Sequence, residues 1–240
     1  MKQTAMKMAV AIALGAASVS ANAALFKLGD RLSIDNGVAT YDAAGYVINV
    51  SSGSFFGMDT GGDSKIANTE KTPMVGLSGI VMGKTQGKGV IDSWSFFGSP
   101  GTDFTSVAPT GNTGNGGPTT ASGINLSGWT VFWPNPGGAN IPMGTGAWTP
   151  PAANCTNLGC TGITFNNGIA AISWDGTYGH TYSLWYTATV PVGSPCCDNV
   201  KYLLHLVGTV SVPVPAAAWL FGSGLLGLVG IARRKKKISA

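Results

Sequence analysis

Two stretches in the carboxyl third of the chain alternate between apolar and polar side chains, and they constrain the fold more than any other feature. Every second residue is apolar from 182 to 190, and the pattern returns from 200 to 210 with one glycine in the apolar register. Successive side chains of a strand point to opposite faces of its sheet, so a period of two predicts a strand with one face on a core. We therefore expect two adjacent antiparallel strands.

The chain before them predicts further short strands. Only 10% of all residues are charged and 36 are glycine, which is typical of strands joined by many turns. The strand candidates are residues 45–50, 74–82, 89–97 and 124–133, the last with a kink at Gly128. Residues 105–123 have almost no apolar side chain and predict a long loop. The predicted fold is all-β: a single, jelly-roll-like β-sandwich over residues 24–211, with an extracellular location.

The amino end has the pattern of a secretory signal peptide over residues 1–23. Two lysines precede a short apolar stretch, and Ala21 and Ala23 supply the A-x-A pattern that signal peptidase recognises. Cleavage is expected before Ala24. The apolar stretch is too short and too rich in alanine to be preferred as a permanent membrane span.

Residues 212–240 contain three elements in a fixed order. They are Val212, Pro213, Val214 and Pro215, then the uncharged residues 216–232, then Arg233, Arg234, Lys235, Lys236 and Lys237. At about 1.5 Å per residue the uncharged segment spans roughly 25 Å, enough for one transmembrane helix. The basic residues would keep its carboxyl end cytoplasmic. A buried core helix is the alternative, but an all-apolar helix closed by five cations fits poorly in a small domain.

This tail resembles the PEP-CTERM sorting signal of Gram-negative bacteria, in its VPxPA-type variant. The resemblance covers about 29 of 240 residues, and Val214 stands where the family has the glutamate of its name, which leaves the cleavage position open. The resemblance implies an exosortase, an integral-membrane cysteine transpeptidase, as processing partner beside signal peptidase. It also implies export through the inner membrane, transient single-pass anchoring, and then location at the envelope surface or in an exopolysaccharide-rich biofilm matrix.

A second, looser resemblance lies within the domain. The motifs SGWTVFW, IPMGTGAW and YLLHLVGTV resemble passenger domains found on VPxPA-tailed proteins. This likeness favours an extracellular β domain and indicates no reaction.

Charge argues against a nucleic-acid partner. Half of the 14 Lys and Arg residues lie in the signal peptide and the tail, whereas all ten Asp and Glu residues lie between them, leaving a net charge of −3 on the domain. A nucleic-acid-binding domain needs a basic face. The basic isoelectric point therefore belongs to the two ends.

Four cysteines predict two disulfides in an exported chain. If residues 161–174 and 180–190 form one hairpin, its register brings Cys160 close to Cys196 and Cys197, so we favour bonds from Cys155 and Cys160 to that pair. The alternative is a local Cys155–Cys160 bond with a Cys196–Cys197 bond, favoured if residues 166–168 turn on their own. A zinc site of these thiols with a histidine is a weak third reading, because the spacing matches no known finger.

The sequence provides little for catalysis, and we expect neither an enzyme nor a cofactor or metal. His180 at a turn and His205 on a strand are most simply structural, and no G-x-S-x-G or H-E-x-x-H motif occurs. A glycosidase pair of carboxylates would meet only in space. Residues 59–63 could offer oxygen atoms to Ca²⁺, but they lack the length of a calcium loop and fit an Asx-rich turn.

Seven tryptophans indicate the possible binding surfaces. Trp129 and Trp133 are expected in the core, whereas Trp148 and Trp185 are candidates for stacking on a sugar ring or another protein. We predict a non-enzymatic exported surface or matrix protein, with exopolysaccharide or other surface proteins as possible partners. A carbohydrate-binding module is the alternative, and a secreted hydrolase is the third.

Overall fold

The computed structural model describes residues 26–111, 123–134, 137–144, 146–195 and 197–212. Strands dominate these residues, and they contain a single α-helix, α1 (Ala152–Leu158), with one 3-10 turn, η1 (Asn68–Glu70). The all-β prediction is confirmed. No helix in the described ranges is long and apolar enough to cross a membrane. The predicted signal peptide and the predicted helix 216–232 lie outside those ranges.

The larger sheet is antiparallel throughout and centred on two long strands. Its order is β10 (Thr110–Gly111), β11 (Gly123–Asn125), β14 (Ile169–Ser173), β15 (Thr181–Thr189), β16 (Lys201–Ser211), β1 (Arg31–Leu32) and β7 (Ile80–Val81). On the same edge that β1 occupies, β16 also pairs with β4 (Phe55–Met58). β4 pairs in turn with β5 (Lys71–Pro73). The β15–β16 pair joins Thr181 to Thr209 and Thr189 to Lys201, which confirms the predicted antiparallel pair.

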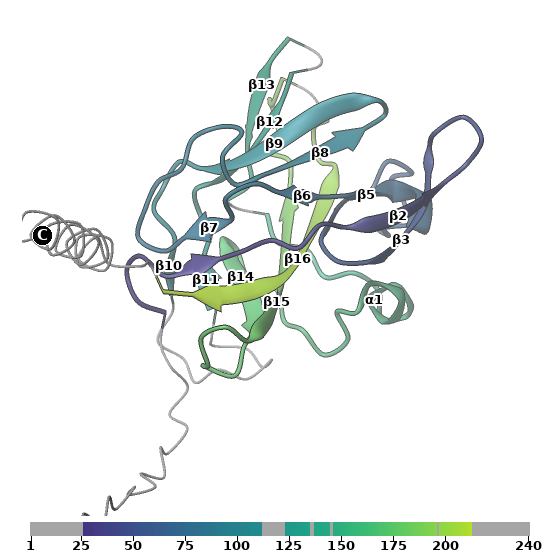
Figure 1. Ribbon diagram of the computed structural model, residues 1–240. Coiled ribbons are helices and arrows are strands. Elements are labelled where there is room, and N and C mark those ends of the chain that lie inside the picture. The colour runs from purple at the N-terminus through teal and green to yellow at the C-terminus, as the bar shows by residue number, and fades with distance from the viewer. Residues whose placement is uncertain (1–25, 112–122, 135–136, 145, 196, 213–240) are drawn as a thin grey trace, which may run out of the picture.

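The smaller sheet lies over the larger one (Figure 1). Its order is β13 (Ala139–Pro142), β12 (Trp129–Trp133), β9 (Ser99–Thr105), β8 (Asp92–Phe96) and β6 (Val75–Gly76). One buried cluster takes side chains from both sheets, including Trp94 of β8 stacked on Phe56 of β4 at 4.6 Å. Trp129 and Trp133 belong to this cluster, so their predicted core position is confirmed. A separate two-stranded ribbon, β2 (Val38–Tyr41) and β3 (Val47–Ser52), projects from the side.

Two predicted strands are each divided between the sheets. Residues 74–82 give β6 in the smaller sheet and β7 in the larger, and residues 124–133 give β11 in the larger and β12 in the smaller. The reason is a close backbone crossing at a glycine. A β-carbon at Gly79 would lie 2.1 Å from the Leu32 carbonyl oxygen, and one at Gly128 would lie 2.2 Å from the Val107 nitrogen.

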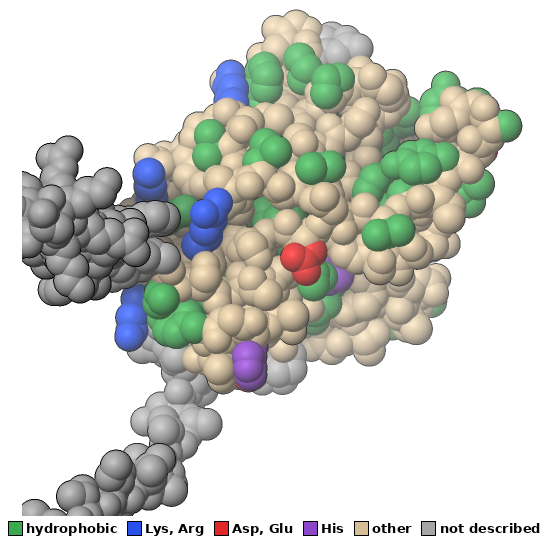
Figure 2. All heavy atoms as spheres, viewed as in Figure 1, with side chains coloured by type: hydrophobic (Ala, Val, Ile, Leu, Met, Phe, Trp, Pro, Cys, Tyr) green, Lys and Arg blue, Asp and Glu red, His purple; other side chains and the backbone are tan. Residues whose placement is uncertain are grey.

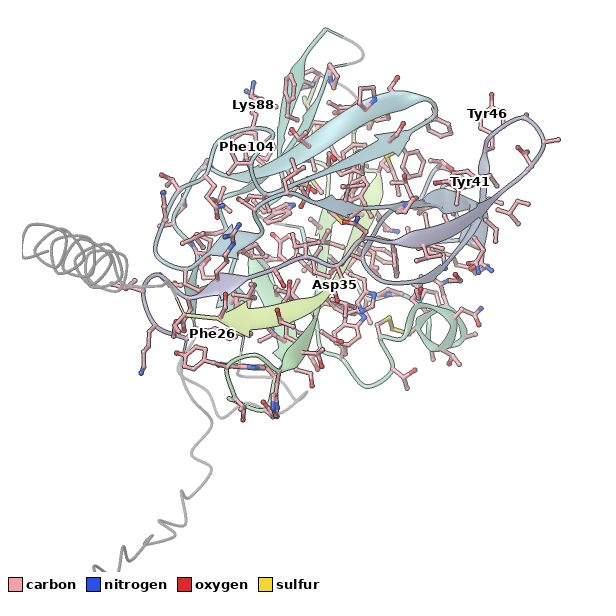
Figure 3. The ribbon with its side chains drawn as sticks, viewed as in Figure 1. Phe26, Asp35, Tyr41, Tyr46, Lys88 and Phe104 are labelled. Carbon is pink, nitrogen blue, oxygen red and sulfur yellow. A yellow bond between two sulfur atoms is a disulfide. The ribbon has the colours of Figure 1, made fainter. Side chains whose placement is uncertain are left out.

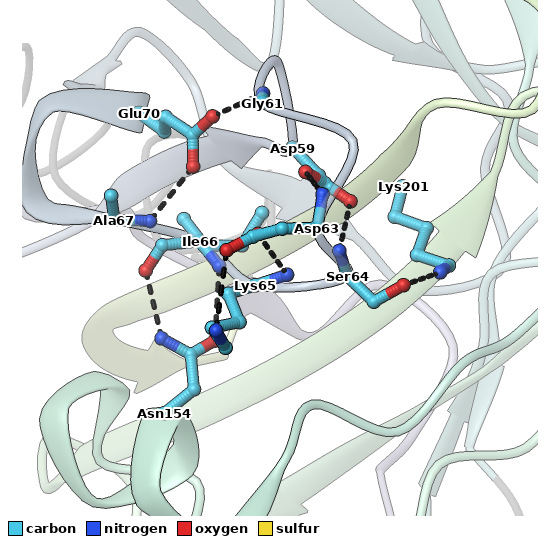
Figure 4. Close-up of polar contacts among 10 residues, drawn as sticks. All are labelled: Asp59, Gly61, Asp63, Ser64, Lys65, Ile66, Ala67, Glu70, Asn154 and Lys201. Atoms are coloured by element: carbon cyan, nitrogen blue, oxygen red, sulfur yellow. Dashed lines mark hydrogen bonds and ion pairs between the residues drawn. The ribbon is translucent and has the colours of Figure 1, made fainter.

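A second, smaller core covers the other face of the larger sheet. Its buried members are Val50, Phe55, Ile66, Cys155, Leu158, Cys160 and Leu203. The layer above the sheet consists of α1 and the segment between β4 and β5. Asn154 of α1 fixes that segment, because its side-chain amide accepts a hydrogen bond from the Ile66 nitrogen (3.0 Å) and donates one to the Ile66 oxygen (2.9 Å; Figure 4).

The favoured disulfide pairing is wrong. Cys155 is bonded to Cys160, as in the alternative, while Cys196 lies outside the described residues. The predicted register failed because the backbone turns at residues 166–168: Ile169 donates from its nitrogen to the Asn166 oxygen at 3.1 Å. Residues 161–168 therefore form a loop and a turn where the first half of a long strand was expected, and Cys160 stays beside Cys155.

Replacing both Cys155 and Cys160 by serine is expected to lower the free energy of unfolding by about 2 kcal/mol, because the unfolded chain loses a short closed loop. Urea unfolding of the oxidised protein and of the variant would measure this. A non-reducing peptide map that joins Cys155 or Cys160 to the Cys196-Cys197 pair would contradict the assignment.

Asn154→Ala is expected to cost about 2 kcal/mol or more, because it leaves the buried nitrogen and oxygen of Ile66 without partners. Asn157→Ala is the matched control, since Asn157 lies exposed on the same helix. Equal unfolding midpoints for the two variants in urea would show that the Asn154 bridge contributes nothing.

Candidate functional site

The structure does not bring the two histidines together. His180 lies exposed at the turn before β15, with its Nδ1 2.6 Å from a carboxylate oxygen of Asp175, and this hydrogen bond lowers the pKa of Asp175. His205 lies on β16, stacked on Trp185 at 4.8 Å, and its ring nitrogens have no hydrogen-bond partner within the described chain. Burial, with the Lys71 charge nearby, lowers the pKa of His205 to about 4. His205 is thus neutral at pH 7.

The acidic loop after β4 uses its carboxylates internally. Asp59 accepts hydrogen bonds from the nitrogens of Asp63 (3.1 Å) and Ser64 (2.9 Å), as in an Asx-rich turn (Figure 4). Glu70 accepts from the Gly61 and Ala67 nitrogens at 2.7 and 2.9 Å. In the described part of the chain, no group of three His, Cys, Asp or Glu side chains is placed to hold a metal ion.

A pair of carboxyl groups that the sequence did not reveal lies inside the core. Asp92 of β8 and Asp103 of β9 face each other across the strand pair, and both are fully buried. Burial raises the pKa of Asp92 to about 7, and burial with the adjacent Asp92 raises that of Asp103 well above its usual range. Two such carboxyls share a proton rather than ionise together. A substrate has no path to this enclosed pair.

The two tryptophans predicted to stack on a ligand are half-buried in the second core. Trp148 donates from Nε1 to the Tyr202 oxygen at 2.8 Å, and one face of Trp185 is covered by His205. The open aromatic side chains are elsewhere. In the described ranges they are Tyr41 (53% exposed), Tyr46 (61%) and Phe97 (64%).

Tyr46 and Phe97 line a groove of about 280 Å³ between the ribbon, β5 and the end of β8. Apolar side chains gather on this side of the molecule (Figure 2), and Tyr41 and Tyr46 both stand on the ribbon (Figure 3). The other lining residues are Asp42, Val47, Ile48, Thr69, Lys71, Thr72, Ser95 and Phe96. The groove therefore combines aromatic walls, hydroxyl groups, one cation and one carboxylate.

Phe97 has a backbone conformation that its side chain does not favour. With Gly98 it makes the two-residue turn between β8 and β9, and both residues have positive φ, 51° and 73°. Such a type I′ turn favours Asn-Gly, and a bulky residue there is strained. The signal was present in the sequence as an aromatic residue before a turn glycine, but the segments that form the groove are too far apart in the chain to be associated by pattern alone.

Comparison of the chain with protein-family models, with curated proteins and with solved structures finds no match in any of the three. The residues of the groove are therefore interpreted from their chemistry.

His205→Phe is expected to weaken the loss of stability at low pH. His205 has a pKa of about 4 in the fold and 6.5 when unperturbed, so the unfolded state binds the proton first, and stability falls as pH drops from 6.5 to 4. The loss reaches about 2–3 kcal/mol. Phenylalanine removes it and fits beside Phe55 and Trp185.

The measurement is urea unfolding of wild type and variant at pH 7 and pH 4.5. The Asp92–Asp103 pair changes stability in the opposite direction, so the comparison is made between the two proteins at each pH. Parallel pH dependence of both proteins would contradict a buried, neutral His205.

Proposed function

We propose that the protein is a non-enzymatic exported protein of the cell surface or extracellular matrix, delivered through an exosortase-type route by its carboxyl tail. The observation that carries the proposal is the position of the two ends of the domain. Arg31 of β1 pairs with Ser211 of β16, and Leu32 with Val210. The strands are antiparallel, so the start of β1 lies beside the end of β16 (Figure 1).

This pairing fits a domain held at a membrane from one side. The predicted signal peptide ends at Ala23 and the predicted tail begins at Val212, directly after β16. Both would leave the same end of the larger sheet, whereas the β2–β3 ribbon lies at the other end. The bond between Cys155 and Cys160 fits the oxidising compartment beyond the inner membrane.

A carbohydrate-binding module is the second candidate. The observation that favours it is the open groove with Tyr46 and Phe97, because aromatic rings beside hydroxyl groups suit a ligand with one apolar and one polar face. We also propose, as the sequence predicted, that the two sheets form a jelly-roll-like β-sandwich.

Deleting residues 212–240 is expected to move the protein from the envelope or matrix into the medium of an exosortase-positive host. Cell fractionation measures the shift, and the intact mass of the wild-type product should lack both residues 1–23 and the basic end of the tail. Tyr41→Ala is the control, since it alters an exposed residue outside the groove lining and leaves the tail intact. A mature product that still ends at Ala240 would refute the sorting route.

A further inference from the structure

Lys71 is a nearly buried cation without an anion. The residue is only 4% exposed, and its ammonium lies 5.2 Å from the ring centroid of Phe55. The ion pairs among the described residues are Lys65–Asp63 and His180–Asp175, so Lys71 has none there. Its Nζ makes no hydrogen bond with a described residue. Burial lowers the pKa of Lys71. Its Nζ is not among the enclosed, unpartnered nitrogens of the described residues, so the ammonium keeps contact with solvent and is open to an anion.

Lys71 lines the same groove as Tyr46 and Phe97. The other charged group there is Asp42, whose Oδ1 accepts hydrogen bonds from the Ala44 and Tyr46 nitrogens at 2.9 and 2.8 Å and so belongs to the ribbon turn. The groove thus contains one cation and one carboxylate, and the two form no ion pair with each other.

The walls supply the remaining recognition chemistry. Thr69 and Ser95 are exposed in the groove and carry hydroxyl groups. Phe97 occupies a strained turn position where asparagine would stabilise the fold better, so the aromatic ring is retained at a cost to the turn.

We propose that this groove binds a carboxylated sugar of an acidic polysaccharide. The carboxylate lies at the Lys71 ammonium, and the sugar ring packs on Tyr46 or Phe97. The inference deepens the proposed function, on which it rests for the presence of a matrix polysaccharide, and it moves the ligand site from the two predicted tryptophans to the groove. The β2–β3 ribbon, which contributes one wall of the groove, lies away from the ends of the described domain (Figure 1), so a membrane-held domain would present this wall outward.

The test uses the full-length protein in detergent, with hexagalacturonate as the probe and its fully methyl-esterified form as the uncharged control with the same rings. Isothermal titration calorimetry is expected to show binding of the acid and at least about tenfold weaker binding of the ester. Equal binding of both forms, or no binding of the acid, would overturn the proposal.

Four variants locate the site. Lys71→Met keeps an apolar chain over Phe55 and should abolish the preference for the acid. Tyr46→Ala and Phe97→Asn should each weaken binding about tenfold, whereas Tyr41→Ala, an exposed ribbon tyrosine outside the groove lining, should change it less than about twofold.

Phe97→Asn separates a binding role from a structural one. Because asparagine favours positive φ, the variant should unfold at a higher urea concentration while it binds more weakly. Unchanged binding by Phe97→Asn and Lys71→Met would refute the groove. Calorimetry does not depend on tail processing, so that result would leave the sorting proposal standing, and a failed sorting experiment would leave the groove standing.

Discussion

The fold depends on β16 because this strand is paired along both edges. One edge is taken over nine residues by β15, from Lys201 to Thr209. The other edge is shared by β4 and β1, which meet its beginning and its end. The amino end of the domain, the segment that leads into the acidic loop and the final hairpin are therefore aligned by the hydrogen bonds of one strand.

β16 is also covered on both faces. Leu204 and Leu206 face the core shared by the two sheets, and Leu203 and His205 face the second core under α1. If only one face of β16 were packed on a core, the His205 ring on the opposite face would be exposed to solvent. The additional layer instead removes water from its nitrogens, which is why this histidine is neutral at pH 7. The same layer places Trp185 and Trp148 between sheet and helix.

The sequence predicts those parts of the fold in which one segment carries its own pattern. The alternation around Leu184 and Leu204 is such a case, because a strand of nine or more residues repeats its period often enough to be recognised. The short strands around Gly79 and Gly128 could not be assigned to a sheet, since the exchange depends on a backbone that passes close by. The disulfide was misassigned because the chain turns at residues 166–168, so the residues before this turn do not continue the predicted pairing with the strand at 180–190.

The groove was hidden from the sequence for a different reason. Tyr46, Lys71 and Phe97 come from a ribbon, a short strand and a hairpin turn, and each has an ordinary explanation when read alone. Only the assembled structure shows that an unpaired ammonium and a strained aromatic residue adjoin the same open surface.

The buried carboxyl pair and the groove residues Lys71 and Phe97 are both costly to the fold, but their surroundings differ. Asp92 and Asp103 are fully enclosed and compensate each other, because a shared proton removes one charge and the Trp94 Nε1 donates to Asp103 at 3.2 Å. Asp92 Oδ2 and Asp103 Oδ1 have no other hydrogen-bond partner among the described residues, so these two oxygens depend on the shared proton. Lys71 has no ion pair among the described residues, Phe97 holds a strained turn position, and both line the groove. A ligand can reach groups that line an open groove, whereas the enclosed carboxyl pair and the buried His205 nitrogens are closed to one.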